Sequence, residues 1–97
     1  MSAATPSIRE LIETELRAAL QPERLIVLDE SAAHAGHSGH REGGESHFRV
    51  RIVSTRFAGR NRVDRHRMVN EILKLAFERG VHALAIEASA PEEPTRW

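Results

Sequence analysis

The stretch from residue 47 to 69 changes its hydrophobic period partway along, and this constrains the fold more than any other feature. Phe48, Val50 and Ile52 alternate with polar residues, which predicts a half-buried strand over residues 47–54. A turn with one glycine follows, and apolar residues then recur at helical spacing. The stretch holds seven arginines and a single acidic residue. We therefore expect a strand, turn and helix that present a surface to an anion or an acidic partner.

Two helices are predicted from apolar residues at helical spacing. The first starts either at Thr5-Pro6 or at Ser7, with Glu10 completing a capping box, and ends at Gln21-Pro22. The second spans residues 62–79 and is followed by Gly80. Its buried face is centred on Val69, Ile72, Leu73 and Ala76, with Met68 and Phe77 at the edges.

Short β-branched runs predict two more strands, at residues 25–28 and 81–88. The first of these is expected to pair antiparallel with residues 47–54 across a loop at 31–46. The last is expected to run parallel to residues 47–54, because a helix separates the two. The order helix, strand, strand, helix, strand predicts an α+β domain, with helices on one face of a three-stranded mixed sheet.

Composition limits the remaining possibilities. The 97 residues make one domain, with a core at about 7–90 and a polar tail at 91–97 in which Glu92-Glu93 is expected to be solvated charge. Zero net charge argues against a protein that coats nucleic acid generally. The absence of cysteine excludes disulfides, and any iron–sulfur cluster would need its thiolates from elsewhere. No membrane-spanning or signal-like run is present, so a cytoplasmic protein is expected.

Histidines are the candidate metal ligands. His34, His37 and His40 lie at three-residue intervals in a glycine-rich loop, where they could bind a metal ion or simply be solvated. His82 shares parity with the core residues of the last strand, which favours a partly buried side chain; alternatively it stands at the mouth of the strand, near the loop. His47 is expected at the surface, and His66 in a packing role.

No nucleophile motif, phosphate-binding glycine loop or paired catalytic carboxylates occur, so an enzyme is not expected. Arginines around the turn and the second helix could instead contact phosphates, which makes DNA a candidate partner. An acidic protein would suit the same basic surface. The candidate nucleic-acid-binding residues are Arg56, Arg60, Arg62, Arg65 and Arg67.

Several separated motifs together resemble the BolA family from about residue 8 to 91. They are Asp29-Glu30-Ser31 with His34, Glu45-Ser46-His47-Phe48-Arg49-Val50, Val53-Ser54 with Arg56-Phe57, Arg65-His66-Arg67-Met68-Val69, and Val81-His82-Ala83-Leu84-Ala85-Ile86. The resemblance implies a fold similar to class II KH domains. It also implies a non-enzymatic regulator or adaptor. We expect the chain alone to be a monomer or weak homodimer.

The resemblance further implies a partner, a monothiol glutaredoxin of the Cys-Gly-Phe-Ser type. In such a heterodimer the glutaredoxin cysteine and a glutathione share a [2Fe–2S] cluster with the BolA-like chain. The implied ligands here are His82 and a loop histidine, because this chain has no cysteine and so matches the histidine subgroup. His34 follows the Asp-Glu-Ser motif and is the implied loop ligand, with His37 and His40 as alternatives. No cofactor is expected in the isolated chain.

Some members of the family are also described as DNA-binding transcriptional regulators of stress and morphology genes. KH domains grip nucleic acid with a Gly-x-x-Gly loop, whereas the corresponding turn here contains only Gly59. This departure argues against KH-style single-strand binding. It leaves open phosphate contacts through the arginines.

Overall fold

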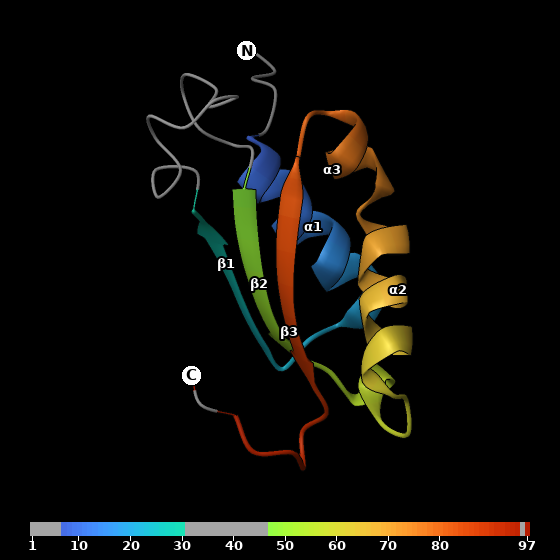
Figure 1. Ribbon diagram of the computed structural model, residues 1–97. Helices are drawn as coiled ribbons and strands as arrows, with labels where there is room; N and C mark the ends of the chain where they lie inside the picture. Colours follow the sequence, from blue (N-terminus) through green and yellow to red (C-terminus); the bar gives the residue numbers. More distant parts are fainter. Residues whose placement is uncertain (1–6, 31–46, 96) are drawn as a thin grey trace.

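Helices α1 and α2 lie on one face of a three-stranded sheet (Figure 1). The computed structural model describes residues 7–30, 47–95 and 97. Its elements are α1 (Ile8–Leu20), β1 (Arg24–Asp29), β2 (His47–Val53), the 3₁₀ turn η2 (Thr55–Phe57), α2 (Arg62–Ile72), α3 (Lys74–Glu78) and β3 (Ala83–Ser89). The predicted α+β architecture is confirmed. None of the helices in this described part is long and apolar enough to span a membrane.

Helix α1 starts at the second of the two predicted caps. The Ser7 side chain accepts a hydrogen bond from the backbone N–H of Glu10 at 3.1 Å, which satisfies one of the helix's free donors. Gln21 ends the helix in a left-handed conformation (φ 45°), directly before Pro22. The buried side chains are four residues apart, at Ile8, Ile12, Leu16 and Leu20, and they face the sheet.

Strand β2 is the centre of the sheet, with β1 antiparallel on one side and β3 parallel on the other. Its alternating side chains behave as predicted, since Phe48, Val50 and Ile52 are almost completely buried. At one end of the sheet the N–H of Glu30 donates to the carbonyl of His47 at 2.8 Å. This bond joins the two ends of segment 31–46, which itself lies outside the described residues.

The second helix is not the single helix predicted over residues 62–79. Leu73 leaves the helical conformation (φ −93°, ψ 18°) and separates α2 from α3. Backbone hydrogen bonds continue across the break, because Leu73 donates to Val69 at 2.9 Å and Phe77 donates to Leu73 at 3.2 Å. The change of direction at Leu73 therefore costs little hydrogen bonding, and no glycine or proline marks it in the sequence.

Ser54 connects the end of α1 to the turn after β2. Its side chain is fully buried and is the one buried polar side chain among residues 7–30, 47–95 and 97. The hydroxyl donates to the carbonyl of Leu20 at 2.7 Å and accepts from the N–H of Arg56 at 3.1 Å. A helix end and the arginine-bearing turn are thus held by a single side chain.

Candidate functional site

His47 and His82 lie side by side where β2 and β3 begin. The two strands are parallel, so both start at the same edge of the sheet, and His47 pairs in register with Ala83. The two imidazole ring centres are 6.3 Å apart, with the ring planes inclined by 41°. The sequence did not predict that these two histidines would meet.

The position of His82 corrects one prediction and favours its alternative. Strand β3 begins at Ala83 rather than at residue 81, so His82 precedes the strand and its side chain is exposed. Parity with Leu84 had favoured a side chain near the core, but parity applies only within the strand. His82 instead lies directly before the strand, at the position that the alternative predicted. His47, expected at the surface, is half-buried.

The three loop histidines, His34, His37 and His40, lie outside the described residues. The points where their segment leaves and rejoins the sheet are nevertheless fixed, because Glu30 and His47 are hydrogen-bonded to each other. Since His47 also contacts His82, the segment returns to the sheet directly beside His82.

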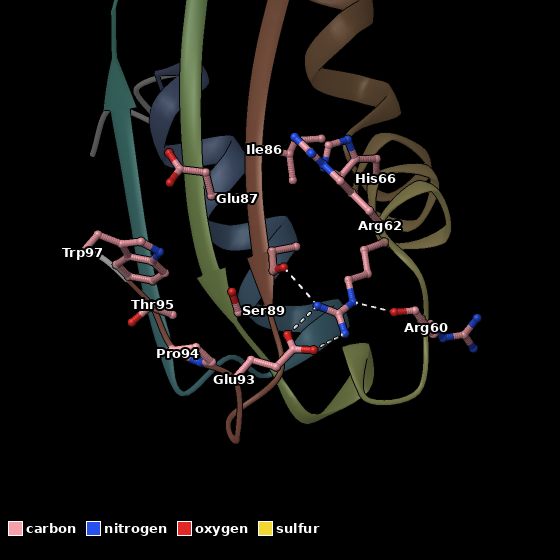
Figure 2. Close-up of a pocket in the computed structure, with 12 residues that line it drawn as sticks. Arg60, Arg62, His66, Ile86, Glu87, Ser89, Glu93, Pro94, Thr95 and Trp97 are labelled. Atoms are coloured by element: carbon pink, nitrogen blue, oxygen red, sulfur yellow. Dashed lines mark hydrogen bonds and ion pairs between the residues drawn. The ribbon is translucent and has the colours of Figure 1, made fainter.

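Five arginines were predicted to bind nucleic acid, and the structure divides them. Arg56, Arg60, Arg62 and Arg67 are exposed, whereas the Arg65 side chain is only 11% exposed. Arg65 donates to the carbonyls of Arg60 at 2.8 Å and Ala88 at 3.2 Å. It also makes a bidentate ion pair with Glu93 at 2.6 and 2.8 Å, which is drawn as dashed lines to Glu93 in Figure 2. Its guanidinium is therefore engaged within the fold.

The ion pair shows that Glu93 was wrongly predicted to be solvated charge. Besides meeting Arg65, its carboxylate accepts the backbone N–H of Ala90 at 2.8 Å. The hydrogen bonds from Arg65 first, and then from Ala90, lower the pKa of Glu93 from 4.5 to about 2. Glu93 in turn raises the pKa of Arg65. The tail after β3 is thereby fastened to the start of α2.

The tail is fastened a second time at the far side of the sheet. Arg24 of β1 donates to the Thr95 hydroxyl at 3.3 Å and to the Trp97 carbonyl at 2.8 Å. Its guanidinium also lies 4.4 Å from the centre of the Trp97 ring. The tail is therefore held at two points, by Arg65 of α2 and by Arg24 of β1.

A cavity of about 530 Å³ lies between the start of α2, the end of β3 and the tail (Figure 2). Arg60, Arg62 and His66 line the cavity. None of these three side chains is paired with an acid of the cavity wall. Its two acids are neutralised, since Glu93 meets Arg65 and Glu87 meets arginines of β2. The charge balance of the cavity therefore favours an anion.

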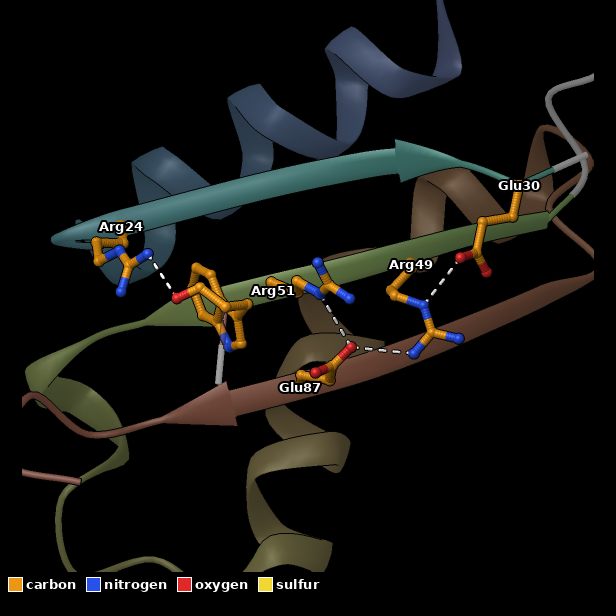
Figure 3. Close-up of polar contacts among 6 residues, drawn as sticks. Arg24, Glu30, Arg49, Arg51 and Glu87 are labelled. Atoms are coloured by element: carbon orange, nitrogen blue, oxygen red, sulfur yellow. Dashed lines mark hydrogen bonds and ion pairs between the residues drawn. The ribbon is translucent and has the colours of Figure 1, made fainter. Parts of the chain in front are cut away.

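The open face of the sheet carries a chain of ion pairs (Figure 3). Arg49 contacts Glu30 at 2.9 Å and Glu87 at 3.0 Å, and Arg51 contacts Glu87 at 3.2 Å. The hydrogen bond from Arg49, followed by that from Arg51, lowers the pKa of Glu87, and the bond to Glu30 is the main reason that the pKa of Arg49 is raised. Arg49 and Arg51 lie on the open face as predicted, but with their charge compensated.

The geometry thus defines a small α+β domain with two separate surface features, an imidazole pair and a cationic cavity. Comparison with known proteins agrees with this fold. Residues 16–93 match the family model described as BolA-like protein. The chain belongs to the BolA family.

Its relatives cover both characterised and uncharacterised proteins. An uncharacterised protein from the 5′ region of cobS in a Sinorhizobium species is 55% identical over 92 residues, which are 94% of this chain and 99% of that protein. The Escherichia coli K12 protein named DNA-binding transcriptional regulator BolA is 45% identical over 86 residues, covering 89% of this chain and 78% of that protein. Relatives from mouse and Arabidopsis thaliana are longer, and the chain spans 64% and 59% of their lengths.

The fold is shared with solved members of the family. The BolA domain of SufE1 from Arabidopsis thaliana superimposes with a TM-score of 0.82 at 41% identity, over 94% of this chain and all of that one. The element order and the mixed sheet are therefore those of a BolA domain.

Proposed function

We propose that this chain is a non-enzymatic adaptor that forms a heterodimer with a monothiol glutaredoxin and helps to hold a shared [2Fe–2S] cluster. The main observation that supports this proposal is the exposure of His82 beside the point where segment 31–46 rejoins the sheet. That segment holds His34, His37 and His40, so an exposed imidazole and a histidine-rich segment share one edge.

The donor chemistry of this edge fits such a cluster. Imidazole is a ligand of iron, and in Rieske centres two histidines replace two cysteines on one iron. The chain has no cysteine, so every thiolate would come from the partner and from glutathione. The cluster would supply reversible one-electron chemistry, at a higher potential than with thiolates alone.

The chain's own contribution is to orient the imidazole. His82 lies between Val81, which is buried and hydrogen-bonded to the carbonyl of Ala76, and Ala83, which enters the sheet. Both neighbours are therefore fixed while the His82 side chain stays in solvent. With His34 as the second ligand, or His37 or His40 in its place, the chain would present two imidazoles to the partner.

Anaerobic reconstitution tests this proposal. The chain, a monothiol glutaredoxin and glutathione are supplied with iron and sulfide, and the visible circular dichroism is compared with that of glutaredoxin alone. We expect a distinct spectrum that His82→Ala abolishes and His66→Ala leaves unchanged, because His66 lies on α2 beside the cavity. A spectrum identical to that of glutaredoxin alone, or one that survives His82→Ala, would refute the assignment.

A second function, DNA binding in transcriptional regulation, is favoured by the cationic cavity. Arg60 and Arg62 are exposed in its wall next to His66, and the acids of the wall are already paired. Their exposed guanidinium groups would contact phosphate oxygens. The Escherichia coli relative is named as a regulator of this kind. Arg56 and Arg67 are exposed nearby and would add to the contacts, whereas Arg65 would serve to hold the turn.

This second function predicts a measurable salt dependence. Each lost phosphate contact reduces the slope of log K against log salt by about 0.9 for duplex DNA, so Arg60→Ala with Arg62→Ala should reduce it by about 1.8. The control is Arg9→Ala with Arg17→Ala, which removes the same charge from α1. Equal slopes for both double variants would mean that the cavity arginines make no special contact.

A further inference from the structure

Strand β1 is an edge of the sheet. Within the residues that the structure describes, it has a neighbouring strand on one side only (Figure 1). Edge strands of natural proteins commonly carry lysine, proline or a bulge, which prevents pairing with another chain. Residues 24–29 contain no lysine or proline, and their charges lie only at the two ends, Arg24 and Asp29. The sequence of this edge therefore lacks the usual protection.

The backbone of Leu25 and Val27 is directed toward the outer side of β1. Glu30 donates its N–H to His47 of β2, and backbone groups alternate between the two sides of an antiparallel strand. Residues 26 and 28 are an even number of positions from Glu30, so their backbone groups also face β2. The N–H and carbonyl groups of Leu25 and Val27 face away from β2, where a further strand can pair with them.

Two large apolar side chains accompany this edge on the open face of the sheet. Ile26 and Leu28 lie opposite Arg51 and Arg49 of β2, and each is 37% exposed. Val27, between them, is buried on the opposite face of the strand. The edge therefore combines apolar surface with backbone groups that suit strand addition.

The open face of β1 is complementary to itself. Along it lie a cation, two apolar residues and an anion, in the order Arg24, Ile26, Leu28 and Glu30. In an antiparallel pair with Val27 of each copy opposite the other, Arg24 meets Glu30 and Ile26 meets Leu28. These are non-hydrogen-bonded positions, at which opposite side chains lie closest. Each contact occurs twice, because the two copies are related by a two-fold axis.

Neighbouring registers lose this match. A shift by one residue would set the open face of one copy against the buried face of the other. A shift by two residues places either Arg24 opposite Leu28 or Glu30 opposite Ile26. The charge pattern therefore selects the register centred on Val27.

We propose that two copies of this chain associate along β1 and join their sheets edge to edge, with Val27 of each copy at the two-fold axis. The axis is perpendicular to the sheet, so the helices of both copies cover the same face. One short strand buries less than the roughly 800 Å² per partner of a stable complex, so the dimer is weak and reversible. Strand β3 and His82 lie at the other edge, and the association therefore requires neither function proposed above.

Sedimentation equilibrium of the full chain, from micromolar to millimolar concentration, tests the association. We expect the average mass to rise from 10.9 kDa toward twice that value. Ile26→Lys should stay monomeric, because its charge would lie against Leu28 of the other copy. The matched control is Leu75→Lys, at an exposed leucine of α3, which should dimerise like the wild type. A monomer at millimolar concentration, or equal dimerisation by Ile26→Lys, would overturn the proposal.

Exchange of the charges tests the register. Arg24→Glu sets two acids opposite each other and Glu30→Arg sets two cations opposite each other, so each variant alone should be monomeric. An equimolar mixture should dimerise, because both contacts become attractive. Each substitution also removes contacts within its own chain, which mixing cannot restore. Arg17→Glu mixed with Glu78→Arg, on α1 and α3, is the charge-matched control and should gain nothing on mixing. If the first mixture stays monomeric, the pairing is refuted.

Hydrogen exchange distinguishes a second copy from a segment of the same chain as the occupant of this edge. The N–H of Val27 should exchange rapidly in the dilute monomer and about tenfold more slowly where the dimer predominates. Protection of Val27 already present in the monomer would mean that the chain covers its own edge, and the proposal would fail. Thermal unfolding followed by circular dichroism checks that each variant is folded.

Discussion

Replacing Ser54 by alanine should destabilise the fold far more than the loss of one oxygen atom suggests. The side chain is fully buried and serves as donor to Leu20 and acceptor from Arg56. Alanine fits the same space, but it leaves the Leu20 carbonyl and the Arg56 N–H without the hydroxyl as hydrogen-bond partner. A buried polar group left unpaired costs about 1–3 kcal/mol, so the free energy of unfolding should fall by about 1–3 kcal/mol.

This loss is large enough to measure in a domain of this size. Each kcal/mol shifts the Tm of a 60–100-residue domain by about 4–8 °C, so the Tm should fall by about 5–20 °C. Thermal and urea unfolding followed at 222 nm would measure it, and the urea m-value should not change. Thr55→Ala, at the exposed neighbouring position, is the matched control. If Ser54→Ala and Thr55→Ala unfold at the same temperature, then the hydroxyl is not a structural connection.

Three further predictions concern polar contacts elsewhere. Asn61 caps α2 by accepting the N–H of Asp64 at 2.8 Å, so Asn61→Ala should lower the free energy of unfolding by about 1 kcal/mol in urea titrations. Since folding lowers the pKa of Glu93 from 4.5 to about 2, its stabilisation is complete above about pH 4.5 and disappears as the pH falls through 2. The stability difference between wild type and Glu93→Gln should therefore shrink over that range, and the fluorescence of Trp97, the single tryptophan, should report release of the tail; a pH-independent difference would contradict this. Glu87→Gln should change stability by less than about 1 kcal/mol, because its ion pairs with Arg49 and Arg51 are about one-third exposed; a larger loss would show that these pairs act cooperatively.

Most of the fold could be predicted because each element carries its own periodicity. The alternation around Val50 and the four-residue spacing in α1 are local patterns, and local patterns are visible in one sequence. The break at Leu73 was missed because no glycine, proline or cap marks it. Leu73 is buried in the core, where it packs with residues far away in the chain, and such contacts leave no local pattern in the sequence.

The candidate site was predictable only in part. His82 was found as a candidate ligand, but its contact with His47 depends on the register of two parallel strands. A signal did exist, because His47 begins β2, His82 directly precedes β3, and parallel strands start at one edge. No comparable signal joined Arg65 to Glu93, which are 28 residues apart and meet only because the tail turns back after β3.

The hydrogen bond between Glu30 and His47 has a consequence for the segment that it closes. A chain reaches at most about 3.5 Å per residue, so His34 stays within about 14 Å of Glu30, and His40 within about 25 Å of His47. Chain length alone therefore ties all three loop histidines to the edge where His82 lies. In the proposed cluster role, His37 or His40 could take the place of His34, whereas His82 would supply the ligand from the described part of the chain. Substitution of His82 should therefore impair the proposed cluster role more than substitution of any single loop histidine.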